Sequence, residues 1–175
     1  MTHGLMLARG KLADGGFFVI VVKRCLSGHC HELDEYVEEP ARYSGVPGSI
    51  GLVKEGGETG PEIGRRSVLL PVRRVNHRYR VLMELKVSHA CAGPNPYALA
   101  YGMLYRPGAS ITAHADGLTL KFKGVTIPAR LHPGGVLVYA LLPPGKNELV
   151  VREPNGQVVA REPAYGPKAR ASCRE

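Results

Sequence analysis

The sequence is poor in amides and aromatic residues. Its 175 residues include no tryptophan, a single glutamine (Gln157) and four asparagines, whereas 14 are proline. Few thermolabile amides and proline-stiffened loops are typical of thermophile proteins. We therefore expect a thermophilic source. This expectation bears on the cysteines, because hyperthermophiles are an exception to the rule that cytosolic proteins avoid disulfides.

Long apolar runs are missing as well. The run Phe17–Val22 is far shorter than the roughly 18 residues that a membrane span needs, and Lys23 and Arg24 follow it at once. The N-terminus, "MTHGLMLARGKLADGG", lacks the basic start, long apolar middle and cleavage site of a secretory signal. These absences predict a cytoplasmic protein without a transmembrane segment.

Catalytic signatures are equally scarce. The chain contains no G-x-S-x-G or H-E-x-x-H motif, and the glycine-rich stretch "GLVKEGGETG" at 51–60 lacks the helix that a phosphate-binding loop opens. His114 and Asp116 are spaced to share a strand face, but an aspartate before Gly117 is explained by chain reversal alone. The sequence thus favours a non-enzymatic protein.

Short β-branched and aromatic segments dominate what is present. "FFVIVVKRC" (17–25) reads as a buried strand, and further strand-like segments recur along the chain with Gly, Pro, Asn or Asp turns between them. They cover 67–75, 78–88, 97–106, 110–131, 134–142, 148–153 and 157–162. This spacing predicts an all-β chain folded as a single-domain β-sandwich, immunoglobulin-like or jelly-roll.

Residues 32–64 break this regular pattern. They are acidic and rich in glycine and proline, and we expect a long loop after the first strand, a mostly irregular insertion into the single domain 1–175. It has room for one short strand at Ser49–Val53, and the acidic Leu33–Glu39 is a helical candidate. Residues 164–175 are expected to form a C-terminal tail.

The clearest hairpin lies near the C-terminus. Asn155-Gly156, between two alternating valine runs, suits a type I′ turn or the end of a longer loop. The segment "LLPPGKNELVVREPNGQVV" resembles the closing strands of many immunoglobulin-like sandwiches, a pattern that several unrelated sandwich folds share. The resemblance implies an architecture and no particular function.

The charge is unevenly distributed. Residues 1–62 hold 6 Lys and Arg against 9 Asp and Glu, a net charge of −3, whereas residues 63–175 hold 17 against 6, a net of +11. Alternation along "RRVNHRYRVLMELKV" places basic side chains on one face of a single strand, and two lysines share a face further on. This predicts a basic face that binds an acidic partner, nucleic acid included, against the alternative of an ordinary solvated sheet. Its residues are Arg74, Arg78, Arg80, Lys121 and Lys123.

A cluster of cysteines and histidines follows the first predicted strand. "KRCLSGHCHELDE" (23–35) and "SHAC" (88–91) together offer soft ligands for zinc or another transition metal. The ligand candidates are Cys25, Cys30, His31, His89 and Cys91. Disulfides or inert buried thiols are the simpler interpretation. Cys25-x4-Cys30-His31 also resembles the long form of the c-type haem attachment motif.

Three hypotheses follow for function. The first is a non-enzymatic sandwich that binds an acidic or protein partner, or assembles with further copies of itself as a homo-oligomer. The second is a nucleic-acid-associated protein that uses the basic face. The third is a metal-binding protein; apart from such a metal, no cofactor is expected.

Overall fold

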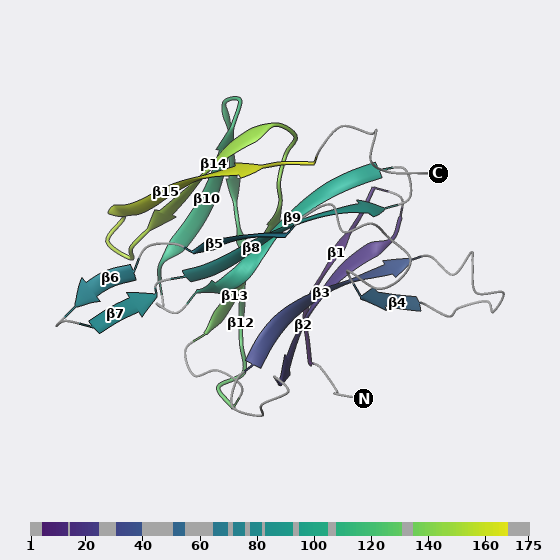
Figure 1. Ribbon diagram of the computed structural model, residues 1–175, viewed down its shortest axis with the longest axis horizontal. Coiled ribbons are helices and arrows are strands. Elements are labelled where there is room, and N and C mark those ends of the chain that lie inside the picture. The colour runs from purple at the N-terminus through teal and green to yellow at the C-terminus, as the bar shows by residue number, and fades with distance from the viewer. Residues whose placement is uncertain are drawn as a thin grey trace. The chain divides into compact units, whose positions relative to one another are not determined.

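The described part of the computed structural model is built from antiparallel β-strands (Figure 1). No helix occurs within it, so the predicted all-β class is confirmed there. Two compact units are distinguished: 1–63 with 90–96 and 170–175, and 64–89 with 97–169. The described residues are 5–13, 15–24, 31–39, 51–54, 65–69, 72–75, 78–81, 83–92, 95–104, 108–130 and 135–167.

The first unit contains a four-stranded sheet of order β1-β2-β3-β4. β2 is central, and its Phe18, Ile20 and Val22 are each at most 2% exposed, which agrees with the strand predicted at 17–25. Gly10 lies opposite Phe18, and a Cβ at Gly10 would overlap the Phe18 ring. The strands are β1 (Leu5–Lys11), β2 (Phe17–Arg24), β3 (His31–Glu39) and β4 (Gly51–Lys54).

Strand β3 corrects the expectation of a helix at Leu33–Glu39. The segment lies in a strand that pairs with β2 from Phe17 opposite Glu38 to Arg24 opposite His31. A ladder beside the apolar β2 satisfies its backbone groups, and this tertiary pairing outweighs the weak local preference of an acidic segment. Two parts of the expected acidic loop are therefore strands, and the rest of 32–64 lies outside the described residues.

The second unit contains a four-stranded sheet, a five-stranded sheet and a two-stranded hairpin. One sheet has the order β11-β10-β14-β15 and the other β12-β13-β9-β8-β5, while β6 pairs with β7 alone. β15 extends through Tyr165, two residues into the expected tail. It is an edge strand of its sheet and contains Pro163. The bounds are β5 (Arg65–Leu69), β6 (Val72–Val75), β7 (Arg78–Val81), β8 (Met83–Ala92), β9 (Asn95–Leu104), β10 (Ser110–Ala115), β11 (Leu118–Lys121), β12 (Lys123–Thr126), β13 (Val136–Leu141), β14 (Lys146–Arg152) and β15 (Val158–Tyr165).

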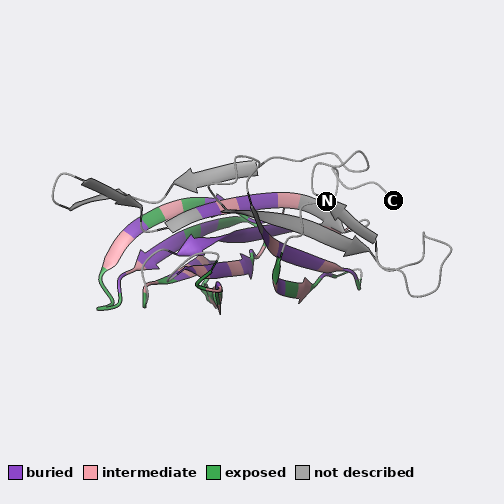
Figure 2. Cartoon of the chain, turned by 90° about the horizontal axis from the view of Figure 1, so that it is seen from below, coloured by how far each residue is buried: buried purple, intermediate pink, exposed green. Residues whose placement is uncertain are grey.

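One apolar cluster draws on both of these sheets. Burial alternates along β10 and through most of β14, as expected for strands with one face toward a core, and buried and exposed positions interchange along the strands in Figure 2. The four-stranded sheet supplies Ile111, Ala113, Leu149, Val151, Ala160 and Ala164, and the five-stranded sheet supplies Leu85, Val87, Ala98, Ala100, Leu104 and Val138.

The chain changes sheets where a longer strand was expected. Residues 110–126 form three strands, and β11 ends at Lys121 while β12 begins at Lys123 in the other sheet, so the two lysines do not share a strand face as predicted. Phe122, between them, packs against the core. The basic run at 74–87 is also divided, because β6 and β7 form their own hairpin and β8 joins the five-stranded sheet. The prediction of a single alternating strand in this run is wrong.

Two tight turns connect strands of the sheet β11-β10-β14-β15. Asp116 and Gly117 have φ angles of 44° and 80°, the pair of positive values that a type I′ turn requires. At the second hairpin only Gly156 has positive φ, at 84°, and its N–H donates to Glu153 O at 2.8 Å. This is a type I turn followed by a left-handed glycine, the longer of the two loops that the sequence allows.

Within the described residues, we find no helix of the length and apolarity that crossing a membrane requires.

Candidate functional site

The predicted basic residues do not form one strand face. Arg74 lies on β6, and Arg78 and Arg80 lie on the paired β7, where Arg80 is opposite Arg73. Lys121 and Lys123 are both exposed, but they belong to different sheets. The side chains of the three predicted arginines lie outside the described residues, so their part in binding stays a prediction.

A different set of charged residues shares a face with Lys121. In an antiparallel sheet, residues directly opposite each other point to the same side. Register across β11, β10, β14 and β15 therefore defines a surface that points away from the apolar cluster, which we call the basic face. It comprises Ser110, Thr112, His114, Thr119, Lys121, Lys146, Glu148, Val150, Arg152, Val158, Arg161, Pro163 and Tyr165.

The charge of the basic face is strongly one-sided. Lys121, Lys146, Arg152 and Arg161 are cationic, and Glu148 is its one carboxylate, which gives a net charge of +3 with His114 neutral. Lys121 and Lys146 are exposed and Arg152 is half-buried. Such a concentration of cations raises the local potential and attracts anionic partners.

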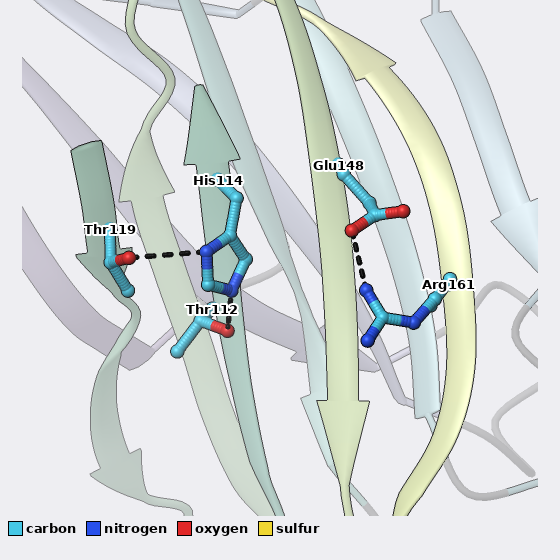
Figure 3. A network of polar contacts seen from close by, with 5 residues as sticks. All are labelled: Thr112, His114, Thr119, Glu148 and Arg161. Atoms are coloured by element: carbon cyan, nitrogen blue, oxygen red, sulfur yellow. Dashed lines mark hydrogen bonds and ion pairs between the residues drawn. The ribbon is translucent and has the colours of Figure 1, made fainter. Parts of the chain in front are cut away.

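Glu148 and Arg161 form an ion pair on this face. Arg161 Nη1 donates to Glu148 Oε2 at 2.6 Å, and the two side chains are 55% and 50% exposed (Figure 3). A pair this exposed is screened by solvent and contributes roughly 0–1 kcal/mol to stability. The ion pair orients the Arg161 side chain but adds little stability, so an incoming anion can compete with Glu148 for Arg161.

His114 lies beside this pair, directly opposite Glu148. Its Nε2 is 3.0 Å from Thr112 Oγ1 and its Nδ1 is 3.1 Å from Thr119 Oγ1 (Figure 3). Hydroxyls both donate and accept, so they can serve either tautomer of the ring. Asp116 occupies the turn, as the chain-reversal interpretation of Asp116-Gly117 expects. The hydrogen bonds fix the imidazole as part of a polar surface.

The centre of the basic face is covered. Val150 is 1% exposed although it faces away from the core cluster, between Thr112 and Arg161 in register. Long charged side chains can cover apolar surface with their stems while their heads remain in water, and Arg161 lies directly opposite Val150. At the end of β15, Tyr165 is 49% exposed opposite Lys146.

The metal site stays a prediction. Cys25 and Cys30 lie outside the described residues, and His31 and Cys91 are described only as positions in β3 and β8. His89 lies in β8 and is half-buried. In the described part of the chain, no three histidine, cysteine, aspartate or glutamate side chains gather as metal ligands would. The disulfide and haem interpretations depend on the same cysteines and stay predictions with it.

Comparisons of the chain with protein-family models, with curated proteins and with solved structures give no match.

Proposed function

We propose that the second unit is a β-sandwich of immunoglobulin-like or jelly-roll type. The apolar cluster to which both sheets contribute supports this, because two packed sheets bury their inner faces against each other. The chain also passes between the sheets at β9–β10, β11–β12 and β13–β14, as strands of a Greek-key sandwich do.

We further propose that the protein is a non-enzymatic interaction module that binds an acidic partner through the basic face. The observation that carries this proposal is the charge of that face, four cations against one carboxylate on one side of a sheet. The surroundings of His114 favour binding over catalysis, since threonine hydroxyls engage both of its ring nitrogens. The proposal moves the predicted interface from the strand that contains Arg78 to the sheet β11-β10-β14-β15.

The test compares two pairs of substitutions. Binding of a fluorescent polyanion, either poly-L-glutamate or an oligonucleotide, is measured by anisotropy at increasing salt. We expect binding at low ionic strength that weakens as salt screens the charges. Lys121→Ala with Lys146→Ala should weaken it about tenfold or more, since each removes an exposed cation from the basic face.

The matched control is Lys123→Ala with Arg130→Ala. It removes the same net charge from exposed positions outside the basic face and should leave affinity nearly unchanged. Equal loss in both double variants would mean that only the total charge matters. Absence of binding to either polyanion at low salt would refute the proposed function.

A further inference from the structure

The residues of the basic face form rows across the sheet. Consecutive rows are two residues apart along each strand, which corresponds to roughly 7 Å. The first row holds Lys146 and Tyr165, the second Thr119, His114, Glu148 and Pro163, the third Lys121, Thr112, Val150 and Arg161, and the fourth Ser110, Arg152 and Val158. A linear ligand running along β14 therefore meets a cation in three of four successive rows.

The remaining row contains Glu148, whose carboxylate is already paired. Its partner Arg161 comes from the third row, so the ion pair joins two rows diagonally. Because both side chains are about half exposed, the pair contributes little and Arg161 can turn to a phosphate. Ser110 adds a hydroxyl that can donate to a phosphate oxygen. Of Thr112 and Thr119, the one that accepts from the His114 ring N–H also keeps its hydroxyl hydrogen for such a contact.

Tyr165 adds a feature that charge alone does not provide. Tyr165 is 49% exposed and lies directly opposite Lys146 in register. An exposed aromatic ring beside a cation can stack an unpaired base while the cation contacts the adjoining phosphate. Paired bases inside a duplex do not offer this contact, and an acidic peptide has no obligatory planar group at each step.

We propose that the basic face binds single-stranded nucleic acid, with the backbone along β14 and a base stacked on Tyr165. This rests on the proposed function, because it specifies the acidic partner of the same surface. The cations in three of the four rows and the adjacent aromatic ring favour a phosphate backbone with stackable bases over a carboxylate-rich protein.

The experiment compares a fluorescent single-stranded oligothymidine with poly-L-glutamate of matched charge and with a duplex of the same length. We expect the single strand to bind about tenfold more tightly than poly-L-glutamate, since only the nucleic acid gains from stacking. The logarithm of its affinity should fall linearly with the logarithm of salt concentration, and Lys121→Ala should reduce that slope by about 1.

Two substitutions separate stacking from charge. Tyr165→Ala should weaken the single strand about tenfold and leave poly-L-glutamate unchanged, while Tyr165→Phe should retain affinity because the ring remains. Glu148→Gln should tighten the single strand several-fold, because it removes the carboxylate of the face and releases Arg161. Lys123→Ala, in the other sheet, serves as the control for Lys121→Ala.

The outcomes distinguish the two proposals. Equal affinity for the single strand and poly-L-glutamate, with no effect of Tyr165→Ala, would overturn nucleic-acid binding and leave an acidic-partner module. Tighter binding of the duplex than of the single strand would overturn it as well, because a paired base cannot stack on Tyr165. Failure of every polyanion to bind would remove both proposals.

Discussion

At the scale of single residues, the absence of a side chain at Gly10 leaves room for the buried ring of Phe18. Phe18 is 2% exposed, and its ring occupies the space that a Cβ at Gly10 would need. Gly10→Ala should therefore lower the free energy of unfolding by about 1–3 kcal/mol, the usual cost of overpacking. Denaturant titration of the purified variant measures this loss.

Gly124 provides the matched control for that substitution. It also lies in a strand, but a Cβ there would be 3.5 Å from Val136 Cγ1, an ordinary van der Waals distance. Gly124→Ala should be neutral or slightly stabilising, since alanine restricts the unfolded chain more than glycine does. Similar destabilisation by both substitutions would contradict a specific overlap with Phe18.

At the scale of elements, Asn147 organises the connection between β13 and β14. It is fully buried, and its Nδ2 donates to Pro143 O at 3.0 Å and to Gly145 O at 3.2 Å. Gly145 O also accepts from Gly166 N at 2.8 Å, which ties the turn to the end of β15. Asn147→Ala removes both side-chain donors and should cost about 1–3 kcal/mol.

Thermal and denaturant unfolding of Asn147→Ala measure that cost. Asn155 provides the comparison, since it is exposed and its Oδ1 accepts one hydrogen bond, at 2.9 Å from Gln157 N in the next hairpin. Asn155→Ala should cost less, because water can replace its carbonyl oxygen. A larger loss for Asn155→Ala would show that the β13–β14 turn does not depend on the buried amide.

The strands that sequence predicted best are those with strong local signals. β2 follows from a run of aromatic and β-branched residues, and the last hairpin follows from Pro154, Asn155 and Gly156 between valine runs. β3 was missed because its residues have little strand preference, and only pairing with β2 makes them a strand. Pairing of this kind is a tertiary effect that local pattern does not contain.

The breaks between strands were also hidden in the sequence. Alternation continues through 78–88 and through Lys121 and Lys123, so a one-strand interpretation fits both. The structure divides them because neighbouring segments pair in different sheets. As a consequence, the predicted interface kept Lys121 and missed Lys146, Arg152 and Arg161. The predicted hairpin contained part of the signal, because alternation along its strand 148–153 places Glu148 and Arg152 on one side; Lys146 preceded that strand, and the structure starts β14 two residues earlier.

At the scale of the whole molecule, two strands connect the compact units along the chain. β8 runs from Met83 in one unit to Ala92 in the other, and β9 begins at Asn95 in the first unit and ends at Leu104 in the second. Because both strands continue from one unit into the other along the chain, we expect the units to unfold together, as the predicted single domain would.

Differential scanning calorimetry tests that coupling. One transition with equal calorimetric and van't Hoff enthalpies is the expected result. Two separated transitions would show that residues 1–63 and 97–169 belong to independent folding units and would contradict the single domain. The expected thermophilic source adds that the transition should lie at high temperature.

Pro163 has a consequence for how the molecule meets its own copies. β15 is an edge strand of its sheet. Proline is tolerated in an edge strand, and because its nitrogen carries no hydrogen it cannot donate a hydrogen bond to a further strand. A ladder extended from β15 would therefore lack a donor at that position. Concentrated solutions should then resist fibre growth by addition of strands to β15. Other molecules would attach to the broad surface of the sheet and not to its edge.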